Sequence, residues 1–163
     1  FLYFKNFIFI VNDLKGLKIR SFRRLDLNRI LEIERECFPN PWAKIFFDIA
    51  HSSYPRGFLV AEVNGKVVGY AVATLECVAD SAQLLNLAVD RKFRGKGIGS
   101  SLLREIIKRV REDGASKLFL QVRVSNSQAI KLYLNFNFQI ERILPKYYHD
   151  GEDAYLMSKK LTS

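Results

Sequence analysis

The stretch from Asn86 to Ser100 constrains the fold most, because it joins an apolar strand to a periodic helix through a glycine-rich turn. Apolar residues alternate up to Val89, and Asp90 then ends the strand pattern. Glycine follows at every second position, and the next helix carries an apolar face made of Ile98, Leu102, Leu103, Ile106, Ile107 and Val110. The first N–H groups of a helix have no partner within it, and the helix dipole adds positive charge there. Such a turn is suited to hold a phosphate or pyrophosphate.

The glycine pattern by itself does not identify the ligand. A Walker loop would end in Gly-Lys-Ser or Gly-Lys-Thr, which this turn lacks. A dinucleotide fingerprint would place its first glycine directly after the strand and an acidic residue about 20 residues further on. Neither feature is present. An ordinary tight turn and an anion site both agree with the pattern, so the choice depends on the rest of the chain.

The turn and three segments downstream of it resemble the motifs of one known family. Arg94-Gly95-Lys96-Gly97-Ile98-Gly99 resembles the Arg/Gln-x-x-Gly-x-Gly/Ala motif of the GNAT family of N-acetyltransferases. Residues 120–126 and 129–133 fall where that family has its fifth strand and the following helix. Residues 145–157 resemble the C-terminal signature of protein N-terminal acetyltransferases of the RimI and archaeal Ard1 type. The resemblance extends over roughly residues 17–161, nearly the whole chain.

The resemblance implies a single mixed α/β domain over residues 17–163. Its mostly antiparallel sheet would splay between strands 4 and 5, with roughly four flanking helices. The implied reaction is transfer of an acetyl group from acetyl-CoA to the α-amine of a protein N-terminus in a direct ternary complex. A lysine side chain or a small amine is the alternative acceptor. A CoA-binding module with little catalysis is the alternative from a different functional class.

The same resemblance assigns the cofactor contacts. The pantetheine arm would lie between the strand that ends at Val89 and the strand that runs through Gln121. The expected backbone contacts are Leu87, Ala88 and Val89 along the arm, and Arg94, Gly95, Lys96, Gly97, Ile98, Gly99 and Ser100 around the pyrophosphate. Asn126 would contact the arm from the other side. Tyr133 matches the family tyrosine that lies near the sulfur and reprotonates it.

Gln121 departs from the family pattern, because close relatives carry Glu or His at the matching position. A glutamine amide cannot act as a base. Three explanations remain open: water held by Gln121 and backbone carbonyls relays the proton, another group (His149, Glu76 or Glu152) replaces the base, or the protein binds the cofactor with little turnover. An α-amine with a pKa near 7.7–8 costs only about 1 kcal/mol to deprotonate at neutral pH, which permits the first explanation.

Two segments are expected to line the substrate site. The loop between the first two helices resembles its RimI form, which places Phe38, Asn40 and Trp42 around the first substrate residue. Tyr147 and Tyr148 match the pair whose hydroxyls hold the substrate's first backbone groups. The structural alternatives are a packed turn with Trp42 in the core and two surface aromatic residues in a flexible loop.

Periodicity and turn residues predict the remaining elements in order. They are a strand (17–24), a helix capped by Asp26 (27–37), a second helix (43–51), a hairpin around Asn64-Gly65 (57–63 and 66–78), a strand (81–90), a helix ending at Asp113-Gly114, a strand (117–124), a helix capped by Ser125 and Asn126, and a final hairpin (138–144 and 153–161). Asn137 stands where the family usually has Gly, and Asn tolerates the left-handed conformation.

The formal net charge of +9 has two interpretations. The chain either has affinity for phosphate-bearing partners such as the ribosome, or it has a solvated surface with basic residues around an anionic cofactor. No long basic run with interleaved aromatic residues occurs, so specific nucleic-acid binding is not predicted. The acceptor peptide is the predicted partner, and both a monomer and a homodimer remain open.

Cys37 and Cys77 have neither the spacing of a disulfide framework nor that of a zinc site, which predicts buried thiols, a cytoplasmic protein and no metal. Residues 1–16 are expected to form an N-terminal extension or an extra strand. Alternatively, they pack on a neighbouring molecule or enter a peptide groove. Their apolar run is too short to span a bilayer as a helix, so no membrane contact is predicted.

Overall fold

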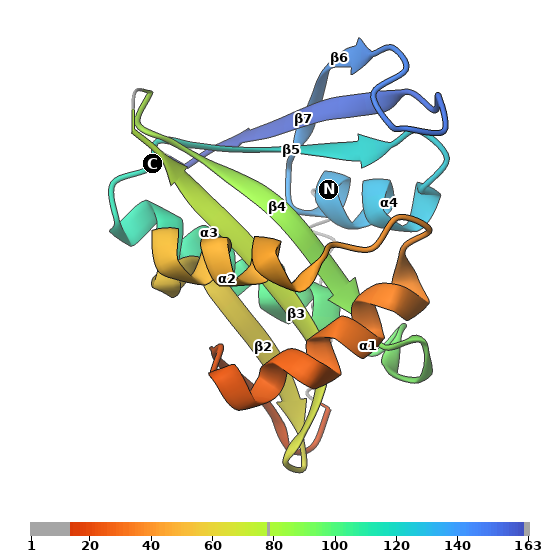
Figure 1. The fold of residues 1–163 in the computed structure, drawn as a ribbon. Helices are drawn as coiled ribbons and strands as arrows, with labels where there is room; N and C mark the ends of the chain where they lie inside the picture. The colour runs from red at the N-terminus through yellow and green to blue at the C-terminus, as the bar shows by residue number, and fades with distance from the viewer. Residues whose placement is uncertain (1–13, 78, 162–163) are drawn as a thin grey trace, which may run out of the picture.

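Seven strands form one sheet in the order β1-β2-β3-β4-β5-β7-β6, and helices cover both faces of it (Figure 1). The computed structural model describes residues 14–77 and 79–161. The strands are β1 (Leu17–Ser21), β2 (Phe58–Val63), β3 (Lys66–Glu76), β4 (Ser81–Val89), β5 (Lys117–Arg123), β6 (Gln139–Leu144) and β7 (Ala154–Lys160). The helices are α1 (Leu27–Cys37), α2 (Lys44–Ser53), α3 (Ile98–Glu112) and α4 (Ser127–Asn135), with short 3₁₀ turns at Arg24–Asp26, Pro55–Gly57 and Arg91–Phe93.

The order and type of these elements confirm the prediction over the described residues, with ends that shift by a few residues. The second helix, for example, runs from Lys44 to Ser53 rather than over residues 43–51. The first strand ends at Ser21, because a 3₁₀ turn begins at Arg24. The extension or extra strand expected over residues 1–16 falls mainly on residues 1–13, which lie outside the described residues.

Apolar side chains pack on both faces of the sheet. On one face the six predicted apolar residues of α3 are all buried against strands β2 to β5, together with residues from α4. On the other face α1 and α2 cover the sheet, with Ile30, Ile33 and Phe47 fully buried against Phe58 and Tyr70 (Figure 1). The sheet therefore separates two apolar layers, and its central strands are buried on both sides.

Strands β4 and β5 pair only at one end. Their parallel pairing covers Ser81–Gln83 of β4, and β5 then pairs with β7 along its whole length. Two residues beyond Gln83, a bulge in β4 leaves Leu85 unpaired with β3. A bulge bends its strand and increases the local twist. The strands diverge from this point, which confirms the predicted splay.

Two asparagines adopt the left-handed conformation. Asn64 has φ 48° and Gly65 has φ 81° in the two-residue turn between β2 and β3, as the Asn-Gly pair predicts. Asn137 has φ 63° directly before β6, so asparagine preserves the turn for which the family usually uses glycine.

Two local predictions are wrong. Asp26 precedes α1 but makes no side-chain cap to it. Its carboxylate instead accepts the Arg23 backbone N–H at 2.7 Å and both terminal nitrogens of the Arg20 guanidinium at 2.8 Å, because the 3₁₀ turn begins before α1. The thiols are also not buried: Cys37 is half-buried, and Cys77 is exposed just beyond the end of β3.

Candidate active site

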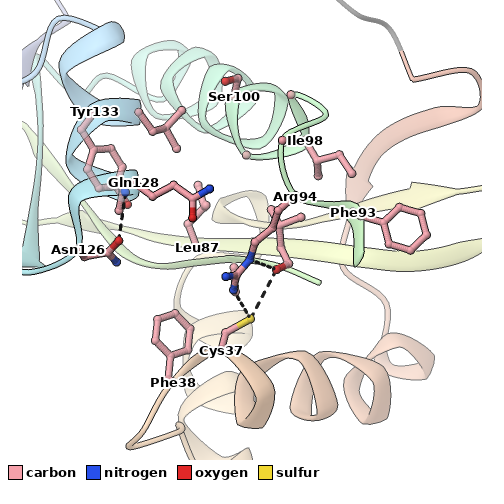
Figure 2. A pocket seen from close by; sticks show the side chains of 17 residues that line it. Cys37, Phe38, Leu87, Phe93, Arg94, Ile98, Ser100, Asn126, Gln128 and Tyr133 are labelled. Atoms are coloured by element: carbon pink, nitrogen blue, oxygen red, sulfur yellow. Dashed lines mark hydrogen bonds between the residues drawn. The ribbon is translucent and has the colours of Figure 1, made fainter. Parts of the chain in front are cut away.

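A cavity of about 420 Å³ lies beside the glycine turn, and we name it the turn cavity. Figure 2 shows its walls: the end of β4 and the turn, the start of α3, the start of α4, and the last residues of α1. It is lined by Cys37, Phe38, Leu87, Ala88, Val89, Phe93, Arg94, Gly95, Gly97, Ile98, Gly99, Ser100, Asn126, Gln128, Ala129, Leu132 and Tyr133.

The turn leaves space where side chains would otherwise lie. Gly95 and Gly97 have φ 74° and 81°, and a Cβ added to either would meet no atom within 4 Å. The first hydrogen bond at the start of α3 runs from the Ser101 N–H to the Gly97 carbonyl at 3.0 Å. The N–H groups of residues 98–100 therefore precede the first hydrogen-bonded turn and face an open cradle at the positive end of the helix dipole. This arrangement fits a pyrophosphate group.

The register of β3 and β4 determines which backbone groups face the gap between β4 and β5. The Asp90 N–H donates to the Val68 carbonyl at 2.8 Å, and Val89 is opposite Gly69. Hydrogen-bonded and non-hydrogen-bonded pairs alternate in an antiparallel ladder. The backbone N–H and carbonyl of Val89 and of Leu87 therefore point away from β3 into the gap. This orientation allows an extended ligand to pair with β4 as a further strand.

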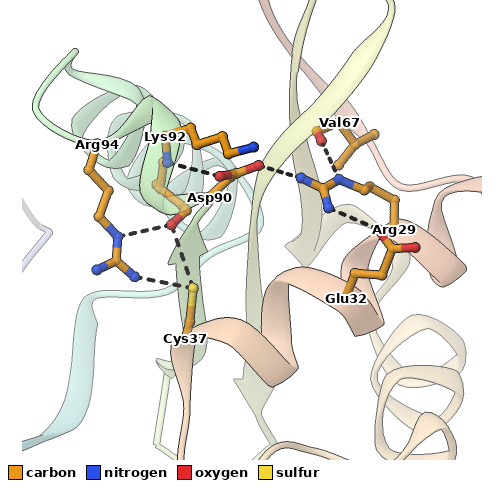
Figure 3. A network of polar contacts seen from close by, with 8 residues as sticks. Arg29, Glu32, Cys37, Val67, Asp90, Lys92 and Arg94 are labelled. Atoms are coloured by element: carbon orange, nitrogen blue, oxygen red, sulfur yellow. Dashed lines mark hydrogen bonds and ion pairs between the residues drawn. The ribbon is translucent and has the colours of Figure 1, made fainter.

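Polar side chains fix the turn to α1 (Figure 3). The buried Asp90 carboxylate accepts the Lys92 N–H at 2.9 Å and forms an ion pair with Arg29 of α1. The Arg94 Nε donates to the Val89 carbonyl at 3.0 Å, and its Nη2 donates to the Cys37 Sγ at 3.2 Å. The end of β4, the turn and the end of α1 are thus held together by a chain of hydrogen bonds.

A second cavity of about 650 Å³ adjoins the first and lies under the loop between β6 and β7, and we name it the loop cavity. It is lined by Glu34, Cys37, Phe38, Pro39, Asn40, Pro41, Trp42, Phe46, Leu84, Leu85, Asn86, Leu87, Leu120, Gln121, Val122, Arg123, Asn126, Ala129, Tyr133, Tyr147, Tyr148 and His149. Both cavities include Cys37, Phe38, Leu87, Asn126, Ala129 and Tyr133. Two ligands placed in them would meet beside Tyr133.

The structure brings together nearly all the site residues predicted from the sequence. The turn cavity is lined by Leu87, Ala88, Val89, Arg94, Gly95, Gly97, Ile98, Gly99, Ser100, Asn126 and Tyr133, and the loop cavity by Phe38, Asn40, Trp42, Gln121, Tyr147 and Tyr148. Lys96 borders neither cavity, because its ammonium group lies over the Phe93 ring at 5.4 Å from the ring centroid. Asn126 also caps α4, since its Oδ1 accepts the Ala129 N–H at 3.1 Å.

The two alternatives for Trp42 are not exclusive. Its half-buried ring packs on the apolar layer under α1 and α2, with its centroid 5.3 Å from that of Phe47. The same residue also lines the loop cavity.

Sequence reasoning missed Glu34, a carboxylate on the sheet-facing side of α1 that lines the loop cavity. It is 1% exposed and accepts hydrogen bonds from the Trp42 N–H at 2.7 Å, the Asn86 Nδ2 at 3.1 Å and the Tyr70 hydroxyl. Burial raises the pKa of Glu34, and these donors offset the rise only in part. A glutamate within the apolar face of an amphipathic helix was the signal in the sequence, because such a position is normally apolar.

The alternatives named for the missing base differ in their placement. Glu76 is exposed at the end of β3 and lines neither cavity. Glu152 accepts hydrogen bonds from Arg123 at 2.7 Å and from the Ser125 N–H at 3.0 Å. Its carboxylate therefore holds the loop between β6 and β7 in place, and it lines neither cavity. His149 lines the loop cavity near its surface. Among the residues that the structure describes, Glu34 is the only carboxylate that lines either cavity.

Three tyrosines line the loop cavity, and one of them, Tyr133, also lines the turn cavity. Burial, followed by the neighbouring Tyr148, raises the pKa of Tyr133 above its usual value, so its hydroxyl stays protonated near neutral pH. Burial also raises the pKa of Tyr148 to about 12. The Tyr147 ring is 49% exposed and meets the Tyr148 ring edge-on with a centroid distance of 5.1 Å.

Two further features are absent from residues 14–77 and 79–161. No group of three or more His, Cys, Asp or Glu side chains in these ranges is arranged to hold a metal ion. None of the helices described there combines the length and apolar character needed to cross a membrane.

Comparisons with known proteins agree with this geometry. The acetyltransferase (GNAT) family matches residues 27–138. An N-alpha-acetyltransferase of Sulfurisphaera tokodaii is 37% identical over 158 residues, covering 90% of this chain and 95% of that protein. The ribosomal protein bS18-alanine N-acetyltransferase of Escherichia coli K12 is 34% identical and covers 86% and 95%. The crystal structure of Ard1 from Thermoplasma volcanium superposes with a TM-score of 0.86 at 30% identity, covering 91% of this chain and 99% of that one.

Proposed function

This chain belongs to the GNAT family of acetyltransferases, and from that premise we propose that it acetylates the α-amine of protein N-termini. The enzyme is an N-acetyltransferase that uses acetyl-CoA. The observation that carries the proposal is the junction of two cavities beside Tyr133, one with an anion cradle and the other covered by the loop that bears Tyr147 and Tyr148.

The turn cavity fits the cofactor. The open cradle at Gly95 and Gly97 and the N–H groups of residues 98–100 would hold the pyrophosphate. The backbone groups of Leu87 and Val89 would pair with the pantetheine arm, and Asn126 would flank it. Acetyl-CoA, when bound, supplies the acetyl group as a reactive thioester.

The loop cavity fits a free chain end. Residues of the loop between α1 and α2 form one wall, and Tyr147 and Tyr148 form the opposite one. Phe38, Asn40 and Trp42 would surround the first side chain of the substrate, and the two tyrosine hydroxyls would bind its first backbone groups. Two tyrosine hydroxyls can bind the backbone groups next to an α-amine, whereas the Nζ of an internal lysine lies at the end of a four-carbon chain away from its backbone, so an N-terminus fits this cavity better.

Proton movement would use residues that line the loop cavity. An attacking α-amine must lose a proton, and its pKa near 7.7–8 makes this loss inexpensive at neutral pH. Glu34 is the buried carboxylate that would accept the proton through water, since its raised pKa brings it closer to that of the amine. Tyr133 would donate a proton to the departing sulfur, because it is protonated at neutral pH and borders both cavities.

Direct transfer is preferred to a covalent enzyme intermediate, although Cys37 borders both cavities. Burial raises the pKa of the Cys37 thiol, an effect that the Arg94 guanidinium offsets only in part. The thiol form is a weak nucleophile. A ternary complex of the two substrates therefore suits these residues better.

Three wider features belong to the same proposal. Residues 17–163 would form one catalytic domain, and the net charge of +9 would favour work beside the ribosome, where nascent N-termini appear. The exposed Cys77 thiol agrees with a reducing cytoplasm. The residues assigned above line the two cavities of a single chain, and the proposal holds for a monomer and for a homodimer.

The proposal is tested with acetyl-CoA and a panel of peptides with free or formylated N-termini, each containing an internal lysine. Mass spectrometry should locate a single acetyl group on the α-amine of the free peptides and none on the blocked ones. Acetylated lysine in the blocked peptides would instead identify a lysine acetyltransferase. Calorimetric binding of CoA without turnover on any peptide would identify a binding module.

A further inference from the structure

The loop between β6 and β7, residues 145–153, rests on one side chain of β5. The Arg123 guanidinium lies under the Tyr148 ring with its central carbon 4.0 Å from the ring centroid. Its Nη1 donates to the carboxylates of Asp150 and Glu152, each at 2.7 Å. The Arg123 side chain is only 19% exposed, so one arginine contacts both the aromatic residue and the acidic residues of this loop.

Glu152 extends this contact to the turn before α4. Its other carboxylate oxygen accepts the Ser125 N–H at 3.0 Å and the Ser125 hydroxyl. Ser125 directly precedes Asn126, which lines both cavities. The loop between β6 and β7 is thereby tied to the segment that borders the turn cavity.

Apart from the Arg123 and Ser125 contacts, the loop is held mainly by hydrogen bonds among its own residues. The Lys146 N–H donates to the Asp153 carboxylate at 2.8 Å, and the Glu152 N–H donates to the Asp150 carboxylate at 3.1 Å. Within it, the Tyr148 N–H donates to the Glu152 carbonyl at 3.1 Å, and the Gly151 N–H donates to the Tyr148 carbonyl at 2.8 Å. Tyr147, His149 and Asp150 are exposed. Without the guanidinium, the carboxylates of Asp150 and Glu152 would repel each other, and Tyr148 would lose a cation–π contact. An arginine can stack on a ring and bind two carboxylates at once because its guanidinium is flat and carries five donors.

We propose that Arg123 is a positioning residue that sets the loop over the acceptor peptide by stacking beneath Tyr148 and binding Asp150 and Glu152. The inference rests on the proposed function, in which Tyr147 and Tyr148 hold the first backbone groups of the peptide. Arg123 acts through Tyr148. It keeps the loop in one conformation, and it takes no part in proton transfer or in transfer of the acetyl group.

The first test is steady-state kinetics of R123Q, R123K and the control R142Q. Arg142 pairs through its backbone with β7, and its side chain makes no hydrogen bond or ion pair with the described residues, so R142Q removes an equal charge outside the loop. In R123Q the KM for the peptide should rise about tenfold, while kcat and the KM for acetyl-CoA change less than about twofold. R123K keeps the charge but not the flat stacking surface, so it should restore part of the peptide KM. R142Q should match the wild type.

The second test is amide hydrogen exchange, which reports on the loop whether or not turnover occurs. In R123Q the amides of residues 145–153 should exchange faster, while those of α3 and β3 keep wild-type rates. Faster exchange throughout the molecule would show general destabilisation and would overturn a specific role. If the wild type acetylates the peptide and R123Q has an unchanged peptide KM, the assignment of Arg123 is wrong although the proposed function stands. Absence of turnover in the wild type would overturn the proposed function, and with it any role of Arg123 in peptide binding.

Discussion

Gln83 of β4 donates a hydrogen bond from its Nε2 to the Oε1 of Gln121 of β5 at 2.7 Å, across the point where the two strands part. The amide oxygen of Gln121 therefore already accepts one hydrogen bond, and its NH₂ group can only donate. A water that takes a proton from an amine needs an acceptor nearby, and an NH₂ group is a donor. The relay through water held by Gln121 is thus less suited to this geometry than a relay through Glu34.

The first prediction compares two glutamate–glutamine exchanges. E34Q should lower kcat/KM by about 10²-fold, because it removes the buried acceptor, whereas Q121E should change it by less than about threefold. The loss of kcat/KM in E34Q should be greatest at pH values where Glu34 is ionised in the wild type. The wild-type kcat/KM should therefore rise with pH as Glu34 and the substrate amine lose their protons. The kcat/KM of E34Q should follow the titration of the substrate amine alone. Rates measured from pH 5 to 9 check this. A large gain in Q121E with little loss in E34Q would place the missing base at residue 121 instead.

The second prediction concerns the anion cradle. G97A adds a methyl group in the open space of the turn at φ 81°, and G114A does the same at φ 99° beyond the other end of α3. Each should destabilise the fold by about 1 kcal/mol through backbone strain. Only G97A should weaken CoA binding, by about tenfold in Kd. Calorimetry and thermal unfolding separate the two effects, and equal CoA affinities in both variants would contradict an anion site at the turn.

The third prediction concerns the proton donor. Y133F should lower kcat by about 10²-fold and leave both KM values nearly unchanged, because it removes a hydroxyl but keeps the ring packed on Phe138. Y155F is the matched control, since Tyr155 packs on the same core without lining either cavity. Steady-state kinetics with saturating peptide provide the measurement. An unchanged kcat in Y133F would show that water, not Tyr133, protonates the sulfur.

The fourth prediction concerns stability. Burial acts to raise the pKa of Asp26, but the hydrogen bonds from Arg20 and the Arg23 N–H outweigh it, so the pKa is lowered. Its stabilising contribution is complete above the unfolded-state pKa of about 3.9 and is lost as pH falls through the lower folded-state value. D26N should reduce the free energy of unfolding by about 2 kcal/mol at pH 7, because Glu62 still pairs with Arg20.

Urea unfolding at pH 7 and pH 3 checks the effect of D26N, and the difference from the wild type should shrink at the lower pH. D48N is the control: Asp48 pairs with Lys44 on the surface of α2, where an ion pair contributes little. If D48N and D26N lower the free energy of unfolding equally, the buried Arg20–Asp26 pair stabilises the fold no more than a surface ion pair does.

Local patterns were sufficient to predict the elements that carry the site. The alternation before Asp90 and the 3.6-residue apolar period of α3 fixed where strand, turn and helix lie, since both periods report directly on which face is buried. The left-handed conformation of Asn137 was also predictable, because the family motif places a turn glycine at this position and Asn tolerates positive φ.

Contacts between distant segments were harder to predict. The carboxylate of Glu34 meets Asn86, 52 residues away, and its pKa depends on the whole apolar layer around it. The cap expected from Asp26 failed for a local reason: the Arg20 guanidinium, six residues earlier on β1, binds the Asp26 carboxylate. The contact of the Lys96 ammonium group with the Phe93 ring could not be predicted either, and the expected role of the Lys96 backbone N–H beside the pyrophosphate stays a prediction.

The three-residue pairing between β4 and β5 gives the sheet two unsatisfied edges inside the molecule. An extended ligand in the gap would hydrogen-bond to strand backbone that has no strand partner there. These hydrogen bonds form only with the folded protein, so ligand binding stabilises the fold. Saturation at about 100 times Kd would add about 2.7 kcal/mol to the unfolding free energy. The folded protein should therefore resist thermal unfolding and proteolysis better with coenzyme A bound than without it.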